Sequence, residues 1–371
     1  MRYISLKIMN YLSRKNVFGI VCLTITAAIV LAGLWPFNFY PQNRVEWLRD
    51  QDGVRFYGRG IIFIAEEFVL PHSAITIEIL LQPESAIPGD IPRILSIFDD
   101  KKLESFFIGQ WRSHLILRKK TKTSYHGKAY QERGIQDILQ KGEKRFVTIT
   151  SRTEGTTFYI DGKFVVDYPK FNIFSDNEGA FSQLILGNSP TGNNYWIGNL
   201  FGLAIYNQTL TKEQIRQHFQ KWSEWEKSSL LPERDLIGLY LFNERSGQYI
   251  HDTVNHHHLL MPSQFQALQK RILIPPWKGF QLNRSFLTDI LTNILGFIPF
   301  GFFFSAYLWV RNKATIYRLL LISVFFGGCL SLAIELIQVY LPSRSSQLMD
   351  VITNILGGAM GVALFSKTRK F

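Results

Sequence analysis

Four long apolar segments with almost no charged residues divide this chain. They cover residues 17–34, 286–310, 316–340 and 351–365. About 20 apolar residues in a helix cross the roughly 30 Å hydrocarbon core of a bilayer, and each segment has that length or nearly so. The pattern therefore predicts four transmembrane helices. We place them at 17–37, about 286–310, 316–340 and 350–366.

The region between the first two apolar segments instead alternates polar and apolar residues over short stretches bounded by turn-forming residues. In residues 157–166 two such stretches flank Asp161-Gly162, a dipeptide that favours the tight turn of a β-hairpin. Thr211 with Gln214 is typical of a helix start and predicts a short helix ending near Trp222. Further strands are predicted at 74–81, 94–98, 114–118, 146–150 and 184–187. The fold class is therefore a membrane α-helical bundle plus an all-β exterior domain.

The charge of the chain indicates how it crosses the membrane. The 41 Lys and Arg residues exceed the 29 Asp and Glu residues, giving a formal net charge of +12. Most of this excess lies on short segments beside the apolar runs, and the remainder of the chain is near balance, so we exclude a nucleic-acid partner. Cytoplasmic loops are enriched in Lys and Arg. The basic clusters are Arg2, Lys7, Arg14 and Lys15; Arg311, Lys313 and Arg318; and Lys367, Arg369 and Lys370.

These clusters predict that both termini and the 311–318 loop lie in the cytoplasm, and that the β-domain and the 341–349 loop lie outside. The predicted domains are a cytoplasmic basic N-terminus at 1–16, a first transmembrane helix at 17–37, an exterior domain with a C-terminal linker at 38–285, and a membrane domain at 286–371. A basic start and an apolar run are also typical of a signal peptide. We favour a retained anchor, because Trp35 and Phe37 suit the headgroup level better than a cleavage site.

Two nearly identical octapeptides, 289–296 and 350–357, each open an apolar segment. In each copy an acid and an amide lie four residues apart, which places them on one helix face. Under the predicted topology these groups lie at the same depth as the outer end of the 316–340 helix and the loop that follows it. The candidate membrane site comprises Asp289, Asn293, Glu335, Gln338, Arg344, Asp350 and Asn354.

Carboxylates in a membrane are costly unless paired or hydrated, so three of them beside one arginine favour a ligand or proton site. We expect Glu335 either to pair with Arg344 or to hold a proton. The alternative is a structural clamp, since interhelical amides and small residues also hold bundles together. Pro299 is expected to kink its helix and free carbonyl groups near the site.

The membrane segments resemble the VanZ-like family. The matching residues are Trp35, Pro36, Phe37 and Phe39; Asp289, Asn293, Phe297, Pro299 and Gly301; Glu335 and Gln338; Arg344; and Asp350, Asn354, Gly357 and Gly361. The resemblance covers 17–40 and 286–371 and implies that the β-domain is inserted after the first helix. It also implies a bacterial inner-membrane protein with a cell-envelope role, and a link to resistance to glycopeptide antibiotics such as teicoplanin.

The exterior region, about 45–250, resembles the concanavalin A-like, laminin-G-like jelly roll. The similarity rests on the strand at 76–79, the Asp161-Gly162 hairpin and the segments at 186–188, 196–198, 204–206 and 210–211. The segment 239–247, which usually opens such domains, comes last here. Members of this family often bind glycans or proteins, sometimes with calcium. Trp111, Tyr195 and Trp196 are candidates for sugar stacking, with core packing as the alternative.

Candidate calcium ligands in the exterior domain are Asp176, Asn177, Glu178, Asn188 and Asn194, although Asp and Asn in turns need no metal. We expect residues 256–258, three histidines in a row, to form a solvated loop rather than a metal site. Glu78 is the only acid in 76–81, and paired-carboxylate hydrolysis needs two, so a glycosidase is disfavoured. Cys22 and Cys329 fall in apolar segments, so the exterior domain has no disulfide.

Three functions remain open. The first is engagement of an envelope lipid or lipid-linked precursor by the membrane site, with glycan or protein binding by the β-domain. The second is a lectin-like module for which the helices are only an anchor. The third is an enzyme or proton-coupled carrier that uses Glu335, although no nucleophile with an adjacent base, phosphate loop or zinc spacing is found. We therefore expect no cofactor, and membrane lipids as partners.

Overall fold

A computed structural model describes residues 2–64, 71, 73–85, 91–99, 104–125, 128–174, 182–224, 230, 234–279 and 284–368. The chain forms two compact units. One contains Met1–Phe39 together with Lys270–Phe371, and the other contains Tyr40–Gln269. The linker that follows the β-domain therefore belongs to the helical unit from Lys270 onward. Asp176, Asn177 and Glu178, proposed above as calcium ligands, lie outside the described residues.

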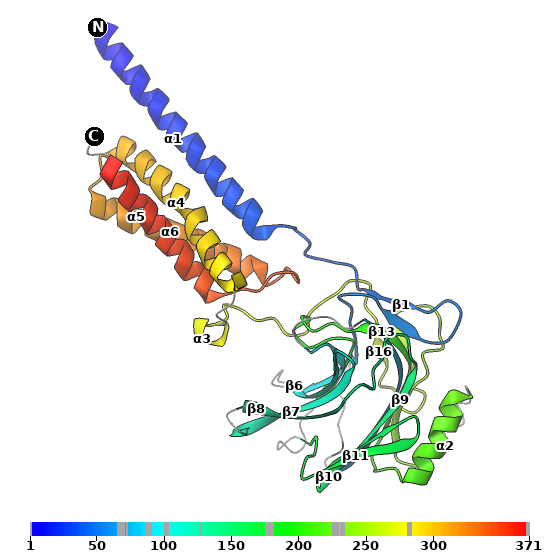
Figure 1. The fold of residues 1–371 in the computed structure, drawn as a ribbon. Coiled ribbons are helices and arrows are strands. Elements are labelled where there is room, and N and C mark those ends of the chain that lie inside the picture. The colour runs from blue at the N-terminus through cyan, green and yellow to red at the C-terminus, as the bar shows by residue number, and fades with distance from the viewer. Residues whose placement is uncertain are drawn as a thin grey trace. The chain divides into compact units, whose positions relative to one another are not determined.

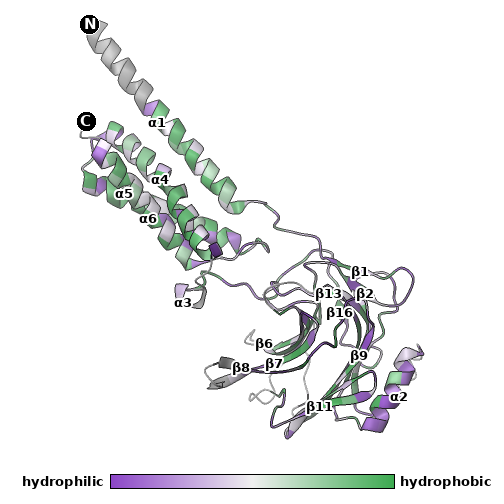
Figure 2. Ribbon diagram, viewed as in Figure 1, coloured by the Kyte–Doolittle hydropathy of each residue, from purple (hydrophilic) through white to green (hydrophobic). Residues whose placement is uncertain are grey.

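Within the described residues, the helical unit contains four long helices and one short one, and the long ones are labelled α1, α4, α5 and α6 in Figure 1. The long helices are apolar along most of their length (Figure 2), and all four are long and apolar enough to cross a membrane. This confirms the prediction of four long apolar helices. The helices are α1 (Arg2–Leu34), α3 (Pro276–Gly279), α4 (Arg284–Asn312), α5 (Ile316–Gln338) and α6 (Leu348–Thr368). Because α1 begins at Arg2, the basic N-terminal residues continue the first helix rather than precede it.

Helices α4 and α6 pack closely because glycines remove side chains from their interface. A Cβ atom placed on Gly361 would lie 2.7 Å from the backbone nitrogen of Phe302, and one on Gly301 would lie 2.8 Å from the carbonyl carbon of Gly358. Gly357 meets the carbonyl group of Ile294 in the same way. Small residues allow such close approach of membrane helices. The repeated sequence thus brings its two copies into direct contact.

The other unit is a sandwich of two antiparallel sheets, which confirms the predicted all-β fold (Figure 1). The first sheet has the order β1-β2-β13-β4-β9-β10-β11, with β14 also pairing with β13. Its strands are β1 (Val45–Trp47), β2 (Val54–Phe56), β4 (Ala74–Ser85), β9 (Arg145–Arg152), β10 (Gly155–Ile160), β11 (Lys163–Pro169), β13 (Ile197–Tyr206) and β14 (Leu236–Tyr240). The late strand β14 lies along β13 at residues 203–206, and the early strand β2 pairs with β13 at residues 198–200.

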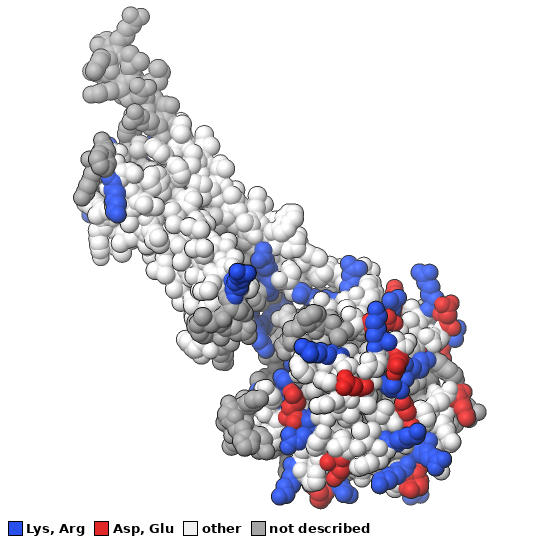
Figure 3. Space-filling model, in the orientation of Figure 1, with Lys and Arg blue, Asp and Glu red and all other residues white. Residues whose placement is uncertain are grey.

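The second sheet has the order β15-β16-β3-β12-β5-β6-β7-β8. Its strands are β3 (Ile62–Ile64), β5 (Arg93–Asp99), β6 (Glu104–Trp111), β7 (His114–Tyr125), β8 (Lys128–Ile135), β12 (Ser182–Leu186), β15 (Tyr249–Ile250) and β16 (Leu259–Leu260). One large apolar core lies between the sheets and includes the fully buried side chains of Phe56, Phe158 and Trp196. Charged side chains cover the sandwich, whereas they are sparse on the long helices (Figure 3).

Local sequence signals explain two features of the sandwich. Asp161 and Gly162 have positive φ angles of 51° and 73°, as the predicted hairpin turn between β10 and β11 requires. Helix α2 (Lys212–Ser223) starts as predicted, with the Thr211 side chain accepting a hydrogen bond from the backbone of Gln214 and the Gln214 side chain accepting one from the backbone of Thr211. This helix packs against β9 and β11 (Figure 1).

Candidate functional site in the helical unit

Glu335 lies buried at the end of α5, where it organises the loop that leads into α6. Its side chain is 3% exposed. Its Oε2 atom accepts a hydrogen bond of 2.8 Å from the backbone N–H of Gln347, one residue before α6, and the Ser346 hydroxyl also donates to it. A carboxylate at a helix N-terminus satisfies backbone donors that have no partner within the helix. Glu335 therefore caps α6.

The same network reaches a segment that the sequence did not single out. The Ser346 hydroxyl accepts a hydrogen bond of 3.1 Å from the backbone of Leu273. Ile274 donates to the carbonyl group of Ser346 at 2.9 Å and accepts from the backbone N–H of Leu348 at 3.1 Å. The linker before α3 thus pairs with the loop between α5 and α6. No local pattern marks this contact, because it joins residues more than 70 positions apart.

Gln338 and Arg344 hold the end of α1. The Gln338 side-chain amide donates to the carbonyl oxygen of Gly33 at 2.7 Å. The Arg344 guanidinium donates to the carbonyl oxygens of Trp35 and Ala32 at 3.1 and 3.4 Å. The last carbonyl groups of a helix have no partner within it, so these contacts cap α1. Within the described residues, Arg344 and Glu335 form no ion pair, although Glu335 lies close enough to interact with the Arg344 charge.

The repeated acids and amides come together at the start of α4 and α6. The Asp350 carboxylate lies close enough to interact with the Asn293 side-chain amide and with the charges of Asp289 and Arg344. Asp289 is exposed on α4, and Asp350 is half-buried. The spacing of the repeat and the glycine contacts of α4 and α6 together produce this arrangement.

Asn354 lies one turn deeper in α6 and is 8% exposed. Its side-chain nitrogen donates to the hydroxyl of Ser331 on α5 at 2.8 Å, whereas its Oδ1 atom has no hydrogen-bond partner in the described part of the chain. An unpartnered polar atom in such a position is costly. Pro299 lies inside α4 and is exposed.

Six of the seven predicted site residues divide into two groups, and Asn354 instead joins α6 to α5 through Ser331. Glu335, Gln338 and Arg344 form hydrogen bonds that cap helices, as a structural clamp requires. Asp289, Asn293 and Asp350 cap no helix end through a side-chain bond that the structure describes, and they present an excess of negative charge. Carboxylate and amide oxygens accept hydrogen bonds from hydroxyl or ammonium groups. Asp289 and Asp350, which we call the acidic pair, can bind a headgroup that carries such donors.

The three candidate sugar-stacking residues of the sandwich differ in how deeply they are buried. Trp196 is fully buried, and its indole N–H donates to Gln110 at 2.7 Å, so it belongs to the core. Trp111, the last residue of β6, follows Gln110 and is 43% exposed. Tyr195 precedes Trp196 and is partly exposed. The Trp196–Gln110 hydrogen bond thus brings Trp111 and Tyr195 to the same end of the sandwich.

A layer of charged residues covers the outer face of β5–β8. Arg93 stacks 3.8 Å from the centre of the Phe107 ring and pairs with Glu104 at 3.4 Å. Arg118 lies 4.0 Å from the centre of the Tyr130 ring and donates to Glu132 at 2.7 Å. Sequence reasoning missed this layer, because its residues lie on four different strands and only the sheet register aligns them.

Asn188 and Asn194 have structural roles in the sandwich. Asn188 is fully buried, donates to Gly60 at 2.9 Å and accepts hydrogen bonds from the backbones of Ser189 and Asn194. Among the described residues, no group of three or more His, Cys, Asp or Glu residues is arranged to hold a metal ion. His258 accepts a hydrogen bond of 3.2 Å from the backbone of Asp252, and its ring packs against that of His256.

Glu78 is fully buried under α2, a second feature that the sequence did not reveal. Its carboxylate lies 2.9 Å from the Nδ1 atom of His218 and accepts a hydrogen bond of 3.1 Å from the indole N–H of Trp222. Tyr206 stacks on His218 and donates to Glu78 at 3.4 Å. These contacts fix α2 to the first sheet, and the described surroundings of Glu78 contain no second carboxylate for glycoside hydrolysis.

Comparison with known families decides the relationship of both parts. Residues 198–369 match the VanZ/LLP1 family, and residues 58–216 match the concanavalin A-like lectin/glucanases superfamily. The chain joins a VanZ-like region to a concanavalin A-like region. The VanZ-like match begins inside the sandwich, at β13, and does not include α1, so the similarity noted at residues 35–39 lies outside it. No curated protein sequence matches the chain.

Solved structures with similar folds are distant. A heptameric pentraxin from Limulus polyphemus is 12% identical with a TM-score of 0.35, covering 48% of this chain and 80% of the pentraxin. A putative carbohydrate binding protein from Bacteroides ovatus is 13% identical with a TM-score of 0.42, covering 60% of this chain and 61% of that protein. A sialidase from Trypanosoma rangeli is 12% identical with a TM-score of 0.36, and the chain spans only 28% of its length. Similarity at this level assigns neither ligand nor activity.

Proposed function

We propose that this VanZ-like membrane protein acts in the bacterial cell envelope, where it engages a lipid or lipid-linked precursor through the acidic pair of α4 and α6. The observation that carries the proposal is the convergence of Asp289, Asn293 and Asp350. Two carboxylates near each other repel, and packing alone does not require them. A headgroup rich in hydroxyl or ammonium donors compensates both charges, so it is the ligand that this geometry supports best.

In this proposal the sandwich binds carbohydrate. The concanavalin A-like match supports a lectin-like role. The exposed ring of Trp111, at the end of β6, can stack on the apolar face of a sugar.

The orientation proposed here follows the basic clusters. Both termini and the 311–318 loop lie in the cytoplasm, and the sandwich and the acidic pair lie on the outer side, where envelope precursors are displayed. A reporter that works only in the cytoplasm should be active when it is fused after Thr368. A reporter that works only outside the cytoplasm should be active when it is inserted in the 341–349 loop. The opposite result would place the acidic pair on the wrong side for this role.

The decisive experiment compares lipids retained by the full chain in polymer nanodiscs. Asp350→Asn, and separately Asp289→Asn, should reduce retention of the bound headgroup class about tenfold, because a hydrogen bond to a charged group contributes about 1.5 kcal/mol or more. Glu213→Gln, an exposed acid on α2, is the matched control. Unchanged lipid composition in both Asp variants, with normal expression, would refute the proposal. The same strains can be scored for teicoplanin tolerance.

The second candidate function is a membrane-anchored binding module without a membrane site. The capping roles of Glu335, Gln338 and Arg344 favour it, because they explain three of the seven predicted site residues by structure alone. Under this function the Asp289 and Asp350 variants keep full activity, whereas Trp111→Ala weakens glycan binding. Glycan-array binding by the full chain separates the two outcomes.

A further inference from the structure

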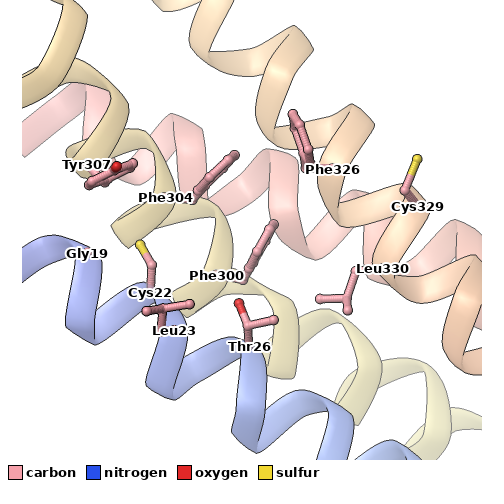
Figure 4. A pocket seen from close by; sticks show the side chains of 10 residues that line it. All are labelled: Gly19, Cys22, Leu23, Thr26, Phe300, Phe304, Tyr307, Phe326, Cys329 and Leu330. Atoms are coloured by element: carbon pink, nitrogen blue, oxygen red, sulfur yellow. The ribbon is translucent and has the colours of Figure 1, made fainter.

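An apolar groove lies between α1, α4 and α5, within the membrane-spanning segments (Figure 4). Its volume is about 570 Å³, nearly four times that of the ~150 Å³ apolar cavity that takes up benzene in a protein core. The α4 wall runs from Phe300 to Tyr307, about 10 Å along the helix axis. The groove is lined by Gly19, Cys22, Leu23, Thr26, Phe300, Phe304, Tyr307, Phe326, Cys329 and Leu330.

The groove opens to the outside of the bundle, because several lining side chains are exposed. Leu23 is 72% exposed and Phe326 is 52% exposed. Figure 4 shows the rings of Phe300, Phe304 and Phe326 on two neighbouring helices around the open space. These surfaces lie within apolar spans, where hydrocarbon rather than water is the surrounding medium. An apolar chain is therefore the occupant that fits the walls.

The lining residues of each helix continue to a basic residue at the same end of the bundle. On α4, Arg311 lies four residues beyond Tyr307, and its guanidinium donates to the Tyr307 hydroxyl at 3.4 Å. On α1, Lys15 lies four residues before Gly19, and on α5, Arg318 lies eight residues before Phe326. Residues at these spacings share a helix face. The groove thus has an apolar body and a positively charged mouth.

The acids of the long helices lie at the opposite end. Asp289, Glu335 and Asp350 are the acidic residues of these helices, and they lie near the start of α4, the end of α5 and the start of α6. A second copy of the chain in the same membrane orientation would place its own basic residues against the basic end of the groove, where like charges repel. An anionic headgroup with an attached hydrocarbon chain complements both parts of the groove.

We propose that this groove binds a phospholipid of the leaflet at the basic end, with one acyl chain against Phe300, Phe304 and Phe326 and the phosphate beside Arg311. The site is separate from the acidic pair and does not depend on the function proposed above. Guanidinium and tyrosine hydroxyl groups both donate to phosphate oxygens. The lipid would fix α1 against α4 and α5.

The only two cysteines of the chain line this groove, which makes its occupancy measurable without an added probe site. The full chain is delipidated in detergent and then mixed with phosphatidylglycerol or phosphatidylcholine. We expect phosphatidylglycerol to slow the reaction of Cys22 and Cys329 with N-ethylmaleimide, and native mass spectrometry to count one retained lipid. Arg311→Gln should weaken retention about tenfold, whereas Lys313→Gln in the adjacent loop should not.

A matched pair on α1 tests the chain-binding part of the groove. Thr26 lines it, and Thr24 is exposed on the same helix outside the lining residues. Thr26→Phe should fill the groove and abolish both lipid retention and cysteine protection, whereas Thr24→Phe should leave them unchanged. Equal labelling with and without lipid would overturn the proposal. Crosslinking of Cys22 to Cys329 between two copies by a bismaleimide would overturn it in favour of a dimer.

Discussion

Substitution of Gly357 by alanine tests the contact that joins the two copies of the repeated sequence. A Cβ atom at Gly357 would lie 3.0 Å from both the Cα and the carbonyl carbon of Ile294, and closer still to its carbonyl oxygen. Backbone atoms cannot rotate away as a side chain can, so α4 and α6 must separate. Overpacking of this kind costs about 1–3 kcal/mol.

The neighbouring glycine provides a matched control. A Cβ atom at Gly358 would meet nothing within 4 Å, so Gly358→Ala adds only the higher helix propensity of alanine, up to about 1 kcal/mol. Both variants add one methyl group to the same turn of α6. We therefore expect Gly357→Ala to be less stable than Gly358→Ala by about 1–3 kcal/mol, and Asn293 to move away from Asp350.

The assay is thermal unfolding of the purified full chain in one detergent, followed by intrinsic fluorescence. The expected order of Tm is Gly358→Ala at or above the wild type, with Gly357→Ala several degrees below. The lipid composition retained by Gly357→Ala should also change, because the acidic pair is held by the same contact. Equal or reversed Tm values for the two alanine variants would show that α4 and α6 do not meet at this glycine.

Three further predictions concern residues outside that contact. Glu78→Ala leaves His218 and Trp222 without the carboxylate that they contact and should lower the free energy of unfolding by about 3 kcal/mol. Limited proteolysis of the full chain should then cleave faster around α2, and unchanged cleavage would contradict the packing described. Arg344→Met should increase amide exchange in residues 30–35 by about tenfold, because the end of α1 loses two capping bonds; exchange equal to the wild type would reject this role. Burial raises the pKa of Asp252, so the folded protein binds the proton of this carboxyl group more tightly than the unfolded chain does. The free energy of unfolding that Asp252 contributes therefore falls as the pH rises from its pKa in the unfolded chain through its pKa in the folded protein. The Tm of Asp252→Asn relative to the wild type should therefore increase with pH across that interval, and a constant difference would contradict it.

Local signals predicted the elements of the fold because each depends on a few neighbouring residues. The Asp161-Gly162 turn needs positive φ angles, and the Thr211 capping box needs two side chains three residues apart. The apolar segments needed only length and composition. The position of the late strand β14 was open, because pairing with β13 is set by partners elsewhere in the chain.

The candidate membrane site was predictable only in part. The four-residue spacing of the repeat places the acid and the amide of each copy on one helix face, since helix geometry fixes which residues share a face. The approach of Asn293 to Asp350 depends on how α4 packs against α6. The partners of Glu335 and Arg344 were not predictable. They are backbone groups of Gln347, Ala32 and Trp35. Every residue carries such groups, so no sequence pattern identifies the ones that bind these side chains.

The contact between α4 and α6 can be measured most directly by disulfide formation. In a full chain with Cys22→Ser and Cys329→Ser, we would introduce Asn293→Cys together with Asp350→Cys and oxidise the protein in its native membrane. The proximity of these two side chains predicts that a disulfide forms readily within one chain. If this pair stays reduced while Asn293→Cys crosslinks to a position on another face of α6, such as Ile352→Cys, the acidic pair does not exist as described.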